Sequence, residues 1–357
     1  MINVTKTFLP DKEKYKKYVD EIFKCGWLTN DGKFVQQLKK ELEEYLGVKH
    51  IILLSNGTIA LQVAYRALEL EGEVITTPFS FVATTSTLAW ERLSPKFIDI
   101  DKETFNIDYT KIEEAITKNT SAIVPVHVFG NPCEVEKIDE IAKKSNLKVI
   151  YDAAHAFGVN YKGKSILNYG DISTMSFHST KVFHTIEGGA IIVNNDELYN
   201  KIKLMINFGI NKLKNIEYLG TNGKMNEFQA AMGLCVLDDM KRIFQERKRV
   251  YEYYINNLPK SIQFQKHKED VIHNYSYFPV AFESEKVLLK VEEYLNRSNI
   301  YPRRYFYPSL ETLPYLKDIQ TVPISSNLSK RILCLPMYDT LDEVELNKIV
   351  NIIKEAI

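Results

Sequence analysis

One lysine in this sequence stands where a solvated surface charge is poorly explained. Lys181 ends the run Ser176-Phe-His-Ser-Thr-Lys181, between two apolar runs at 173–177 and 189–193. A lysine amine that burial or cationic neighbours deprotonate forms Schiff bases with carbonyl compounds. We therefore interpret Lys181 as a group that can hold a carbonyl compound covalently.

A carboxylate and a histidine follow another apolar run, 148–152. The motif is Asp152-Ala-Ala-His155. A carboxylate at the end of a buried strand is expected to face a cationic partner. Asp152 could hold a protonated pyridine nitrogen, where its negative charge helps the ring to accept electrons. A helix cap beside a hydrogen-bonded histidine explains the same residues equally well.

The motif Ser55-Asn-Gly-Thr58 joins an apolar run to a helical stretch. Gly57 allows close approach of a ligand to the backbone, Thr58 is a good helix N-cap, and free N–H groups at a helix start attract phosphate. Taken alone, the motif is better explained as an ordinary capped helix.

An aromatic side chain stands at the end of the next strand-like run, in Thr77-Pro-Phe-Ser-Phe81. Phe81 could stack on a planar ring, although an aromatic residue at such a position more often belongs to the core. Together with the phosphate motif, Lys181 and Asp152, it completes the set of groups that bound pyridoxal phosphate requires.

The elements that must position these residues alternate between strands and helices. Such alternation predicts a mostly parallel α/β sheet, whose ligands bind beyond the carboxyl ends of the strands. The predicted strands are 50–55, 73–77, 95–100, 122–126, 148–152, 173–177 and 189–193, and the predicted helices include 58–70 and 109–117.

A long helical stretch from about Asn226, without proline until Pro259, suits a connector to a second domain. We expect a large domain with an N-terminal arm over residues 1–245. The remainder, 246–357, mixes short strands and helices and is expected to form a smaller α+β domain.

The composition is that of an ordinary globular protein. Lysine plus arginine and aspartate plus glutamate number 46 each among 357 residues, so net charge gives no reason to expect a nucleic-acid or membrane partner. No GxGxxG or GxxxxGK[ST] follows a strand, which disfavours a non-enzymatic nucleotide-binding protein. The seven histidines are dispersed, and we expect no metal site.

The four cysteines suggest a reducing compartment. They lack CxxC spacing, which favours reduced and mostly buried thiols over disulfides or a zinc site. The N-terminus lacks the apolar core of a signal peptide, so we expect a cytoplasmic protein. The cysteines are Cys25, Cys133, Cys235 and Cys334.

Several motifs, spread along nearly the whole chain, occur in the order that is typical of one family. They are Gly26-Trp-Leu-Thr-Asn-Asp-Gly32, Ser55-Asn-Gly-Thr58, Thr77-Pro-Phe-Ser-Phe-Val-Ala-Thr84, Val126-His-Val-Phe-Gly130, Asp152-Ala-Ala-His155, 176–189, Gly220-Thr-Asn-Gly-Lys-Met-Asn-Glu-Phe-Gln-Ala-Ala231 and Leu333-Cys-Leu-Pro-Met337. In them the sequence resembles the sugar aminotransferases of the DegT/DnrJ/EryC1/StrS group. The resemblance implies a fold-type I pyridoxal-phosphate aminotransferase, with a large, mostly parallel mixed sheet domain and a smaller α+β C-terminal domain.

The resemblance also implies the roles of individual residues. Lys181 and Asp152 would be the catalytic pair, with Lys181 bound covalently to pyridoxal 5′-phosphate and Asp152 at its pyridine nitrogen. His155 would lie near the ring hydroxyl, and Phe81 would stack on the ring.

Other matching positions would hold the cofactor's phosphate. Gly57, Thr58 and Ser176 would bind it within one subunit. Asn222 would reach it from a second subunit, which implies a homodimer with a shared active site.

The implied reaction is transfer of an amino group from L-glutamate to a nucleotide-linked keto-sugar. Residues 177–189 and 151–158 resemble most the branch that acts at C4 of dTDP-4-keto-6-deoxyglucose. The product would be dTDP-4-amino-4,6-dideoxyglucose, for surface polysaccharides such as O-antigen or lipopolysaccharide.

Two alternatives stay open. A branch acting at C3 of a dTDP-3-keto-6-deoxyhexose usually has glutamine where His155 stands. Related sugar dehydratases have histidine in place of the lysine, so the presence of Lys181 favours transamination.

Selectivity for the sugar must come from the cavity wall. Arginine suits phosphate and tyrosine suits sugars and bases, although a solvated loop anchored by aromatic residues is equally compatible with these positions. Two histidines flank the lysine, where local packing is as good an explanation. The candidate substrate-binding residues are His178, His184, Arg303, Arg304, Tyr305 and Tyr307.

Overall fold

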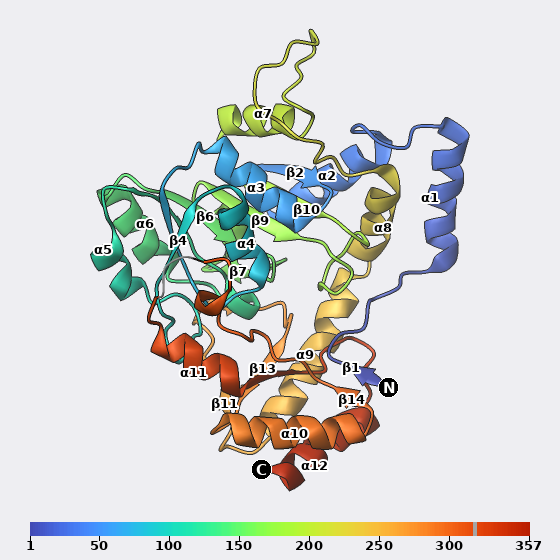
Figure 1. The fold of residues 1–357 in the computed structure, drawn as a ribbon. Helices are drawn as coiled ribbons and strands as arrows, with labels where there is room; N and C mark the ends of the chain where they lie inside the picture. The colour runs from blue at the N-terminus through green and yellow to red at the C-terminus, as the bar shows by residue number, and fades with distance from the viewer. Residues whose placement is uncertain (317–319) are drawn as a thin grey trace.

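Seven strands form one mixed sheet at the centre of the upper part of the molecule in the computed structural model (Figure 1). The structure describes residues 1–316 and 320–357. The strand order is β2-β10-β9-β6-β5-β3-β4, and neighbouring strands are parallel except where β10 pairs with β2 and β9. The prediction of a mostly parallel α/β sheet is therefore confirmed.

The strands occupy the predicted apolar runs, with small shifts at their ends. Alternate side chains of a strand point to opposite faces of the sheet, and a sheet covered on both faces therefore needs almost continuous apolar sequence. The strands are β2 (His50–Leu54), β3 (Glu73–Thr76), β4 (Ser94–Phe97), β5 (Thr120–Val124), β6 (Lys148–Asp152), β9 (Ile172–Ser176) and β10 (Gly189–Val193).

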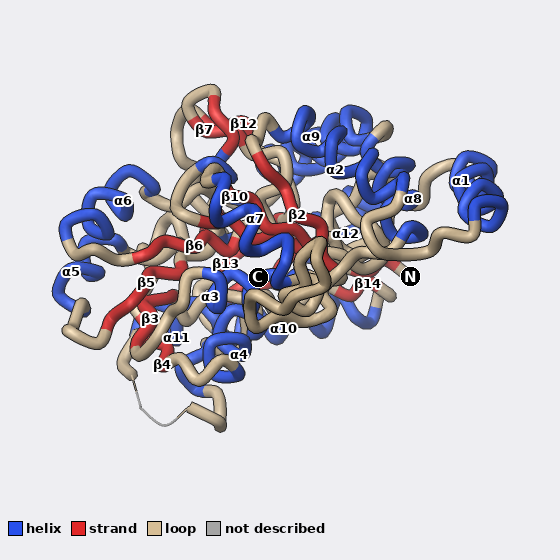
Figure 2. The backbone as a smooth tube through the Cα atoms, turned by 90° about the horizontal axis from the view of Figure 1, so that it is seen from above, coloured by secondary structure: helices blue, strands red, loops and turns tan. Residues whose placement is uncertain are grey.

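Helices cover both faces of this sheet (Figure 2). In β2, Ile51 and Leu53 join one hydrophobic core, whereas Ile52 and Leu54 join another on the opposite face. The covering helices are α2 (Lys33–Leu46), α6 (Val135–Lys144) and α8 (Glu227–Leu237) on the first face, and α3 (Gly57–Ala67), α4 (Val82–Trp90) and α7 (Asp196–Met205) on the second.

The C-terminal part builds a separate core around a small antiparallel sheet, seen in the lower half of Figure 1. The N-terminus joins this core, because β1 (Ile2–Asn3) pairs with β14 (Ile300–Tyr301). The division at residues 245 and 246 stays a prediction. The elements of this part are α9 (Met240–Asn257), β11 (Gln263–Phe264), β13 (Phe278–Ala281), α10 (Glu285–Arg297), α11 (Pro323–Arg331), β15 (Ile332–Leu335) and α12 (Glu343–Ala356).

Short elements complete the described chain. The first helix, α1, packs against α8 at one side of the molecule (Figure 1). A three-stranded ribbon, in the order β12-β7-β8, joins the loop after β6 to the C-terminal part. These elements are α1 (Lys12–Cys25), β7 (Asn160–Tyr161), β8 (Lys164–Ser165) and β12 (Val271–Ile272).

The helical stretch predicted from about Asn226 is interrupted once, because the chain forms two helices that meet at Asp238 and Asp239. Aspartate competes with helical backbone hydrogen bonds and favours helix ends. The two helices also need different surroundings. Nearly all of α8 is buried, against α1 and α2, whereas α9 buries one side and packs against α12.

The helix predicted at 109–117 is also shorter than expected. It consists of a 3₁₀ turn, Tyr109–Lys111, and the four-residue α5 (Ile112–Ala115). Residue Ile116 is already extended, because the chain must turn there towards β5.

All four cysteines are free thiols, and three of them are buried while Cys25 is exposed. No helix of the described residues has the length and apolar character needed to cross a bilayer.

A buried carboxylate ties the sheet to the C-terminal part. Asp99 follows β4, and its oxygens accept N–H groups of Ile324 and Ser325 at 2.8 Å each, in the first turn of α11. It also accepts the N–H of Ile100 at 2.9 Å. The first N–H groups of a helix have no acceptor within the helix, so Asp99 satisfies donors that would otherwise be buried without partners.

We expect Asp99→Ala to lower the free energy of unfolding by about 1–3 kcal/mol, because it removes a cap from buried N–H groups. Urea unfolding of the two proteins measures the difference. Glu114→Ala, which changes an exposed carboxylate, is the control. Equal urea midpoints for the two variants would contradict a stabilising role of Asp99.

Candidate active site

A cavity of about 570 Å³ lies at the carboxyl ends of the sheet strands, where ligands of open α/β sheets bind. Loops that follow β2, β3, β6 and β9 form its floor, and side chains of the C-terminal part form one wall. The structure thus brings together the predicted cofactor-binding residues Gly57, Thr58, Phe81, Asp152, His155, Ser176 and Lys181.

Lys181 lies in the loop that connects the antiparallel strands β9 and β10. Backbone bonds shape this loop: Phe177 and Thr185 donate to the carbonyls of Gly188 and Phe177, at 2.8 and 2.9 Å, and the Lys181 N–H donates to His178 at 2.8 Å. A side chain at Gly188 would meet the Thr185 hydroxyl at 2.0 Å, so only glycine fits there.

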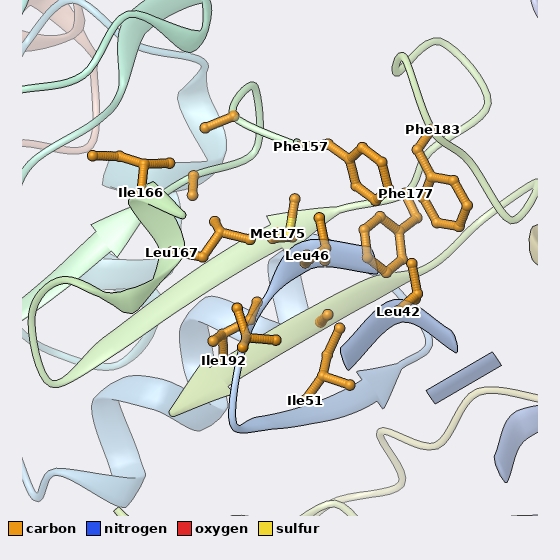
Figure 3. Close-up of a cluster of buried hydrophobic side chains, with 14 of the residues drawn as sticks. Leu42, Leu46, Ile51, Phe157, Ile166, Leu167, Met175, Phe177, Phe183 and Ile192 are labelled. Carbon is orange, nitrogen blue, oxygen red and sulfur yellow. The ribbon is translucent and has the colours of Figure 1, made fainter. Parts of the chain in front are cut away.

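Aromatic packing anchors the same loop on both sides of the lysine (Figure 3). Phe177 and Phe183 are fully buried and meet edge to face, with centroids 4.9 Å apart. Phe183 also stacks on Phe157 at 4.4 Å. Because both ends of the lysine segment are fixed in the core, the amine of Lys181 is held at the cavity.

Burial lowers the pKa of the Lys181 amine to about 8, although the Asp152 carboxylate acts in the opposite direction. A lysine in water is almost fully protonated at neutral pH. The cavity therefore leaves a larger fraction of this amine unprotonated at neutral pH, and so able to act as a nucleophile or base, than of an exposed lysine.

Asp152, at the end of β6, is 5% exposed. Burial raises the pKa of its carboxyl group, and three interactions oppose this effect. Thr84 Oγ1 donates to Oδ2 at 2.7 Å, the Ala154 N–H donates to Oδ1 at 3.1 Å, and Lys181 supplies positive charge. These interactions favour a carboxylate that can bind a cationic group.

His155 forms part of an aromatic stack beside the amine. Its ring lies parallel to those of Phe129 and Phe306 and 4.7 Å from Tyr277. Burial, with a contribution from the Lys181 cation, lowers the pKa of the imidazole, so the ring is neutral. Nδ1 accepts the Phe129 N–H at 3.3 Å, which assigns the ring proton to Nε2 and makes that atom a donor.

The start of α3 has the features of an anion site. The N–H groups of Gly57 and Thr58 are the first of the helix and have no acceptor within it. A side chain at Gly57 would meet Ser176 Cβ at 2.9 Å, so glycine lets Ser176 approach the helix start. The expected cap at Thr58 is wrong: Asn56 is the N-cap and accepts the Ile59 N–H at 2.9 Å.

Three of the candidate substrate-binding residues line the cavity: His178, Arg303 and Tyr305. The Arg303 guanidinium lies 4.7 Å from the Tyr305 ring. The His178 ring lies 3.5 Å from the exposed Glu187 carboxylate, which also lines the cavity.

The other candidates are placed elsewhere in this chain. His184 is buried, and its Nε2 lies 2.7 Å from the carbonyl of Phe8 in the N-terminal segment. Arg304 forms an ion pair with Glu285 at 2.7 Å and lies over the ring of Tyr307.

Asn222 is also absent from this cavity wall. Its side-chain oxygen accepts a hydrogen bond from Lys224 at 2.7 Å, beside the outer strand β2. A direct contact with the cofactor of its own subunit is therefore not supported by this geometry.

Sequence reasoning missed Ser80, Thr84 and Tyr277. Ser80 and Tyr277 line the cavity, and Thr84 binds Asp152 from behind. The four-residue spacing of Ser80 and Thr84 at the start of a helix was the available signal, because it places two hydroxyls on one side. Nothing in the sequence around Tyr277 points to the cavity.

Comparison with known proteins extends these observations to the whole chain. A family model described as the DegT/DnrJ/EryC1/StrS aminotransferase family matches residues 10–354. A dTDP-4-amino-4,6-dideoxy-D-glucose transaminase of Shigella dysenteriae is 45% identical over 99% of this chain and 98% of that protein. A protein of the same name from Escherichia coli is 41% identical over the same shares. The solved structure of DesI in the presence of its TDP-sugar product matches with a TM-score of 0.94 and 30% identity, over 99% of this chain and 92% of that one.

The lowered pKa of Lys181 predicts an unusual pH profile for its modification by formaldehyde and a borohydride. In cofactor-free protein, labelling of Lys181 should level off above about pH 8, because the amine is then neutral. Labelling of an Nα-acetyl-lysine reference, whose ε-amine is free, should continue to rise about tenfold per pH unit towards pH 10. Mass spectrometry of the peptide measures the rate, and parallel profiles for the two amines would contradict the prediction.

Proposed function

The chain belongs to the DegT/DnrJ/EryC1/StrS aminotransferase family, and we propose that it converts dTDP-4-keto-6-deoxy-D-glucose and L-glutamate to dTDP-4-amino-4,6-dideoxy-D-glucose and 2-oxoglutarate. The family establishes a pyridoxal-phosphate aminotransferase, as the sequence predicted. The substrates, the site residues and the assembly are the proposed part.

The observation that carries the proposal is the placement of a buried amine and a buried carboxylate in one cavity. Lys181 lies in the loop between β9 and β10 and Asp152 ends β6, and each influences the pKa of the other. Identity of 45% over nearly all of the Shigella dysenteriae transaminase supports the choice of sugar.

The residues of the cavity fit pyridoxal phosphate at each of its functional groups. The free N–H groups of Gly57 and Thr58, with the nearby Ser176, suit its phosphate. The Asp152 carboxylate suits a protonated pyridine nitrogen, and the Lys181 amine suits an aldehyde. Phe81, which is 48% exposed and lines the cavity, offers an aromatic face to the ring.

Bound pyridoxal phosphate supplies an aldehyde that accepts the amino group and a ring that withdraws electrons from the carbon that loses its proton. The protein must orient the reactants and move that proton. Lys181 Nζ, neutral above about pH 8, would take the proton from the α-carbon of the amino donor and deliver it to the former aldehyde carbon of the cofactor. The Asp152 carboxylate would hold the pyridine N–H, and the His155 Nε2–H could donate to the ring hydroxyl oxygen.

The wall formed by the C-terminal part would recognise the substrates. Arg303 has no ion pair among the described residues, and its guanidinium can bind a carboxylate or phosphate. Tyr305 and His178 can bind sugar hydroxyls. A remote nucleotide that is held by such contacts positions the ketone for reaction.

We infer a homodimer in which Asn222 completes the partner's site. The loop at 208–219, which projects at the top of Figure 1, exposes large apolar side chains that favour burial. Leu213, Ile216 and Leu219 are each at least three-quarters exposed. Docking of this loop on a second copy would carry the adjacent Asn222 to the interface.

Amination at C3 is the second candidate, and dehydration is the third. The presence of His155 favours C4 over C3, because glutamine usually stands there in the C3 branch. Lys181 favours amination over dehydration.

The substrate proposal predicts that the protein aminates dTDP-4-keto-6-deoxyglucose faster than the dTDP-3-keto isomer, with L-glutamate as donor. The two sugars are incubated separately, and NMR locates the new nitrogen, which we expect to be equatorial at C4. Lys181→Ala is the control without transfer. Faster reaction of the 3-keto isomer would overturn the position of amination, and loss of water without amine formation would overturn the reaction class.

The shared site predicts recovery of activity when two inactive chains are mixed. A heterodimer of Lys181→Ala and Asn222→Ala chains contains one intact site, so random exchange should restore about a quarter of the wild-type activity. Lys181→Ala mixed with a chain that carries both substitutions is the matched control, because it contains no intact site. Absence of recovery in heterodimers that native mass spectrometry has identified would contradict the shared site.

A further inference from the structure

Two hydroxyl groups form a hydrogen-bonded chain behind the Asp152 carboxylate. Thr84 Oγ1 lies 2.7 Å from Asp152 Oδ2, and Ser80 Oγ lies 2.9 Å from Thr84 Oγ1. Thr84 is completely buried, whereas Ser80 is 2% exposed and lines the cavity. The chain therefore connects the inner side of the carboxylate to the cavity wall.

The charge of Asp152 determines the direction of every bond in this chain. An ionised carboxylate only accepts hydrogen bonds, so Thr84 must donate its one proton to Asp152. Ser80 must then donate its own proton to Thr84, and its remaining lone pairs face the cavity. A protonated Asp152 could donate to Thr84 instead, and the whole chain could reverse.

We propose that Ser80 and Thr84 are positioning residues that hold Asp152 as an oriented carboxylate for the pyridine nitrogen of the cofactor. This inference rests on the proposed role of Asp152. It extends that role to two residues that do not contact the pyridine nitrogen themselves.

The surroundings of Asp152 explain why such support is needed. Apart from Thr84, the hydrogen-bond donor to its carboxylate among the described residues is the Ala154 N–H. Burial favours the protonated acid, and Thr84 is the strongest influence in the opposite direction. Losing the Thr84 hydroxyl would leave the oxygen Oδ2 without a donor in a buried site.

The ionisable groups that face Asp152 from other elements do not replace this hydroxyl. Lys181 supplies positive charge, but its amine must be free to react. His155, which lines the same cavity, is buried, and burial lowers its pKa, so its ring is neutral. Tyr65, from α3, is neutral because burial raises its pKa.

The protein offers a closely matched control position on α4, the helix that carries Thr84. Thr85 is also completely buried in α4, and its hydroxyl has no hydrogen-bond partner among the described residues. Thr84→Val and Thr85→Val therefore make the same chemical change one residue apart. They differ in the hydrogen bond to Asp152.

The experiment measures pyridoxal-phosphate affinity of cofactor-free protein against pH, from the absorbance of the bound form. Thr84→Val should bind about tenfold or more weakly than wild type, because a hydrogen bond to a charged group is lost. As the solution is acidified, the affinity of Thr84→Val should begin to fall at a higher pH than the affinity of wild type. The reason is that Asp152 is protonated more easily in this variant. Thr84→Ser should restore affinity to within about threefold, Ser80→Ala should show a smaller loss, and Thr85→Val should stay within about twofold of wild type.

Thermal unfolding of each cofactor-free variant separates binding from folding. If Thr84→Val does not fold, Ser80→Ala and Thr84→Ser still test the inference through the same binding curves. Equal affinity and pH profiles for Thr84→Val and Thr85→Val would overturn the role of the hydrogen-bonded hydroxyls of Ser80 and Thr84. Failure of the wild-type protein to bind pyridoxal phosphate would instead overturn the proposed use of the site.

Discussion

The structure depends on keeping an amine and a carboxylate together at one cavity. Desolvation favours the neutral form of both groups, whereas their mutual attraction favours the charged forms. For Asp152, burial is the largest effect and raises the pKa of the carboxyl group, whereas bonds from Thr84 and Ala154 support the charged form. For Lys181, burial is also the largest effect and lowers the pKa of the amine to about 8. The same cavity therefore contains a carboxylate that two hydrogen bonds support and an amine that readily loses its proton.

The sheet and its loops provide the rigidity that this arrangement requires. Asp152 ends β6, a strand between two parallel neighbours, and cannot move without disturbing both. The Lys181 loop is held by a buried phenylalanine on each side. Because a tightly packed core has few alternative arrangements, even a small change of side-chain volume in this core would shift the residues of the site.

The C-terminal part completes the cavity and is joined to the sheet by polar contacts. The Asp99 carboxylate caps α11, and Asn274 and Ser276 donate to the carbonyl of His155 at 2.8 Å each. Hydrogen bonds therefore join the C-terminal part, which carries Arg303, to the loop that carries His155.

Local sequence determined the strands, indicated the cofactor and pointed to Lys181 and Asp152, whose roles stay a proposal. A buried strand requires continuous apolar residues, and a charged residue directly after one is unusual enough to be noticed. The tertiary structure decided which residues support them. Thr84 and Tyr277 lie far from Asp152 and Lys181 in sequence, and their contacts exist only after distant elements pack together.

The break between α8 and α9 was decided partly at the same level: two aspartates favour a helix end there, and the packing of each helix determines its direction. The choice of the N-cap residue of α3 depended on the local backbone conformation. Asn56 and Thr58 are both suitable capping residues, and the backbone conformation of the turn after β2 selects Asn56. Sequence thus specified the chemical groups, whereas packing specified their hydrogen-bond partners.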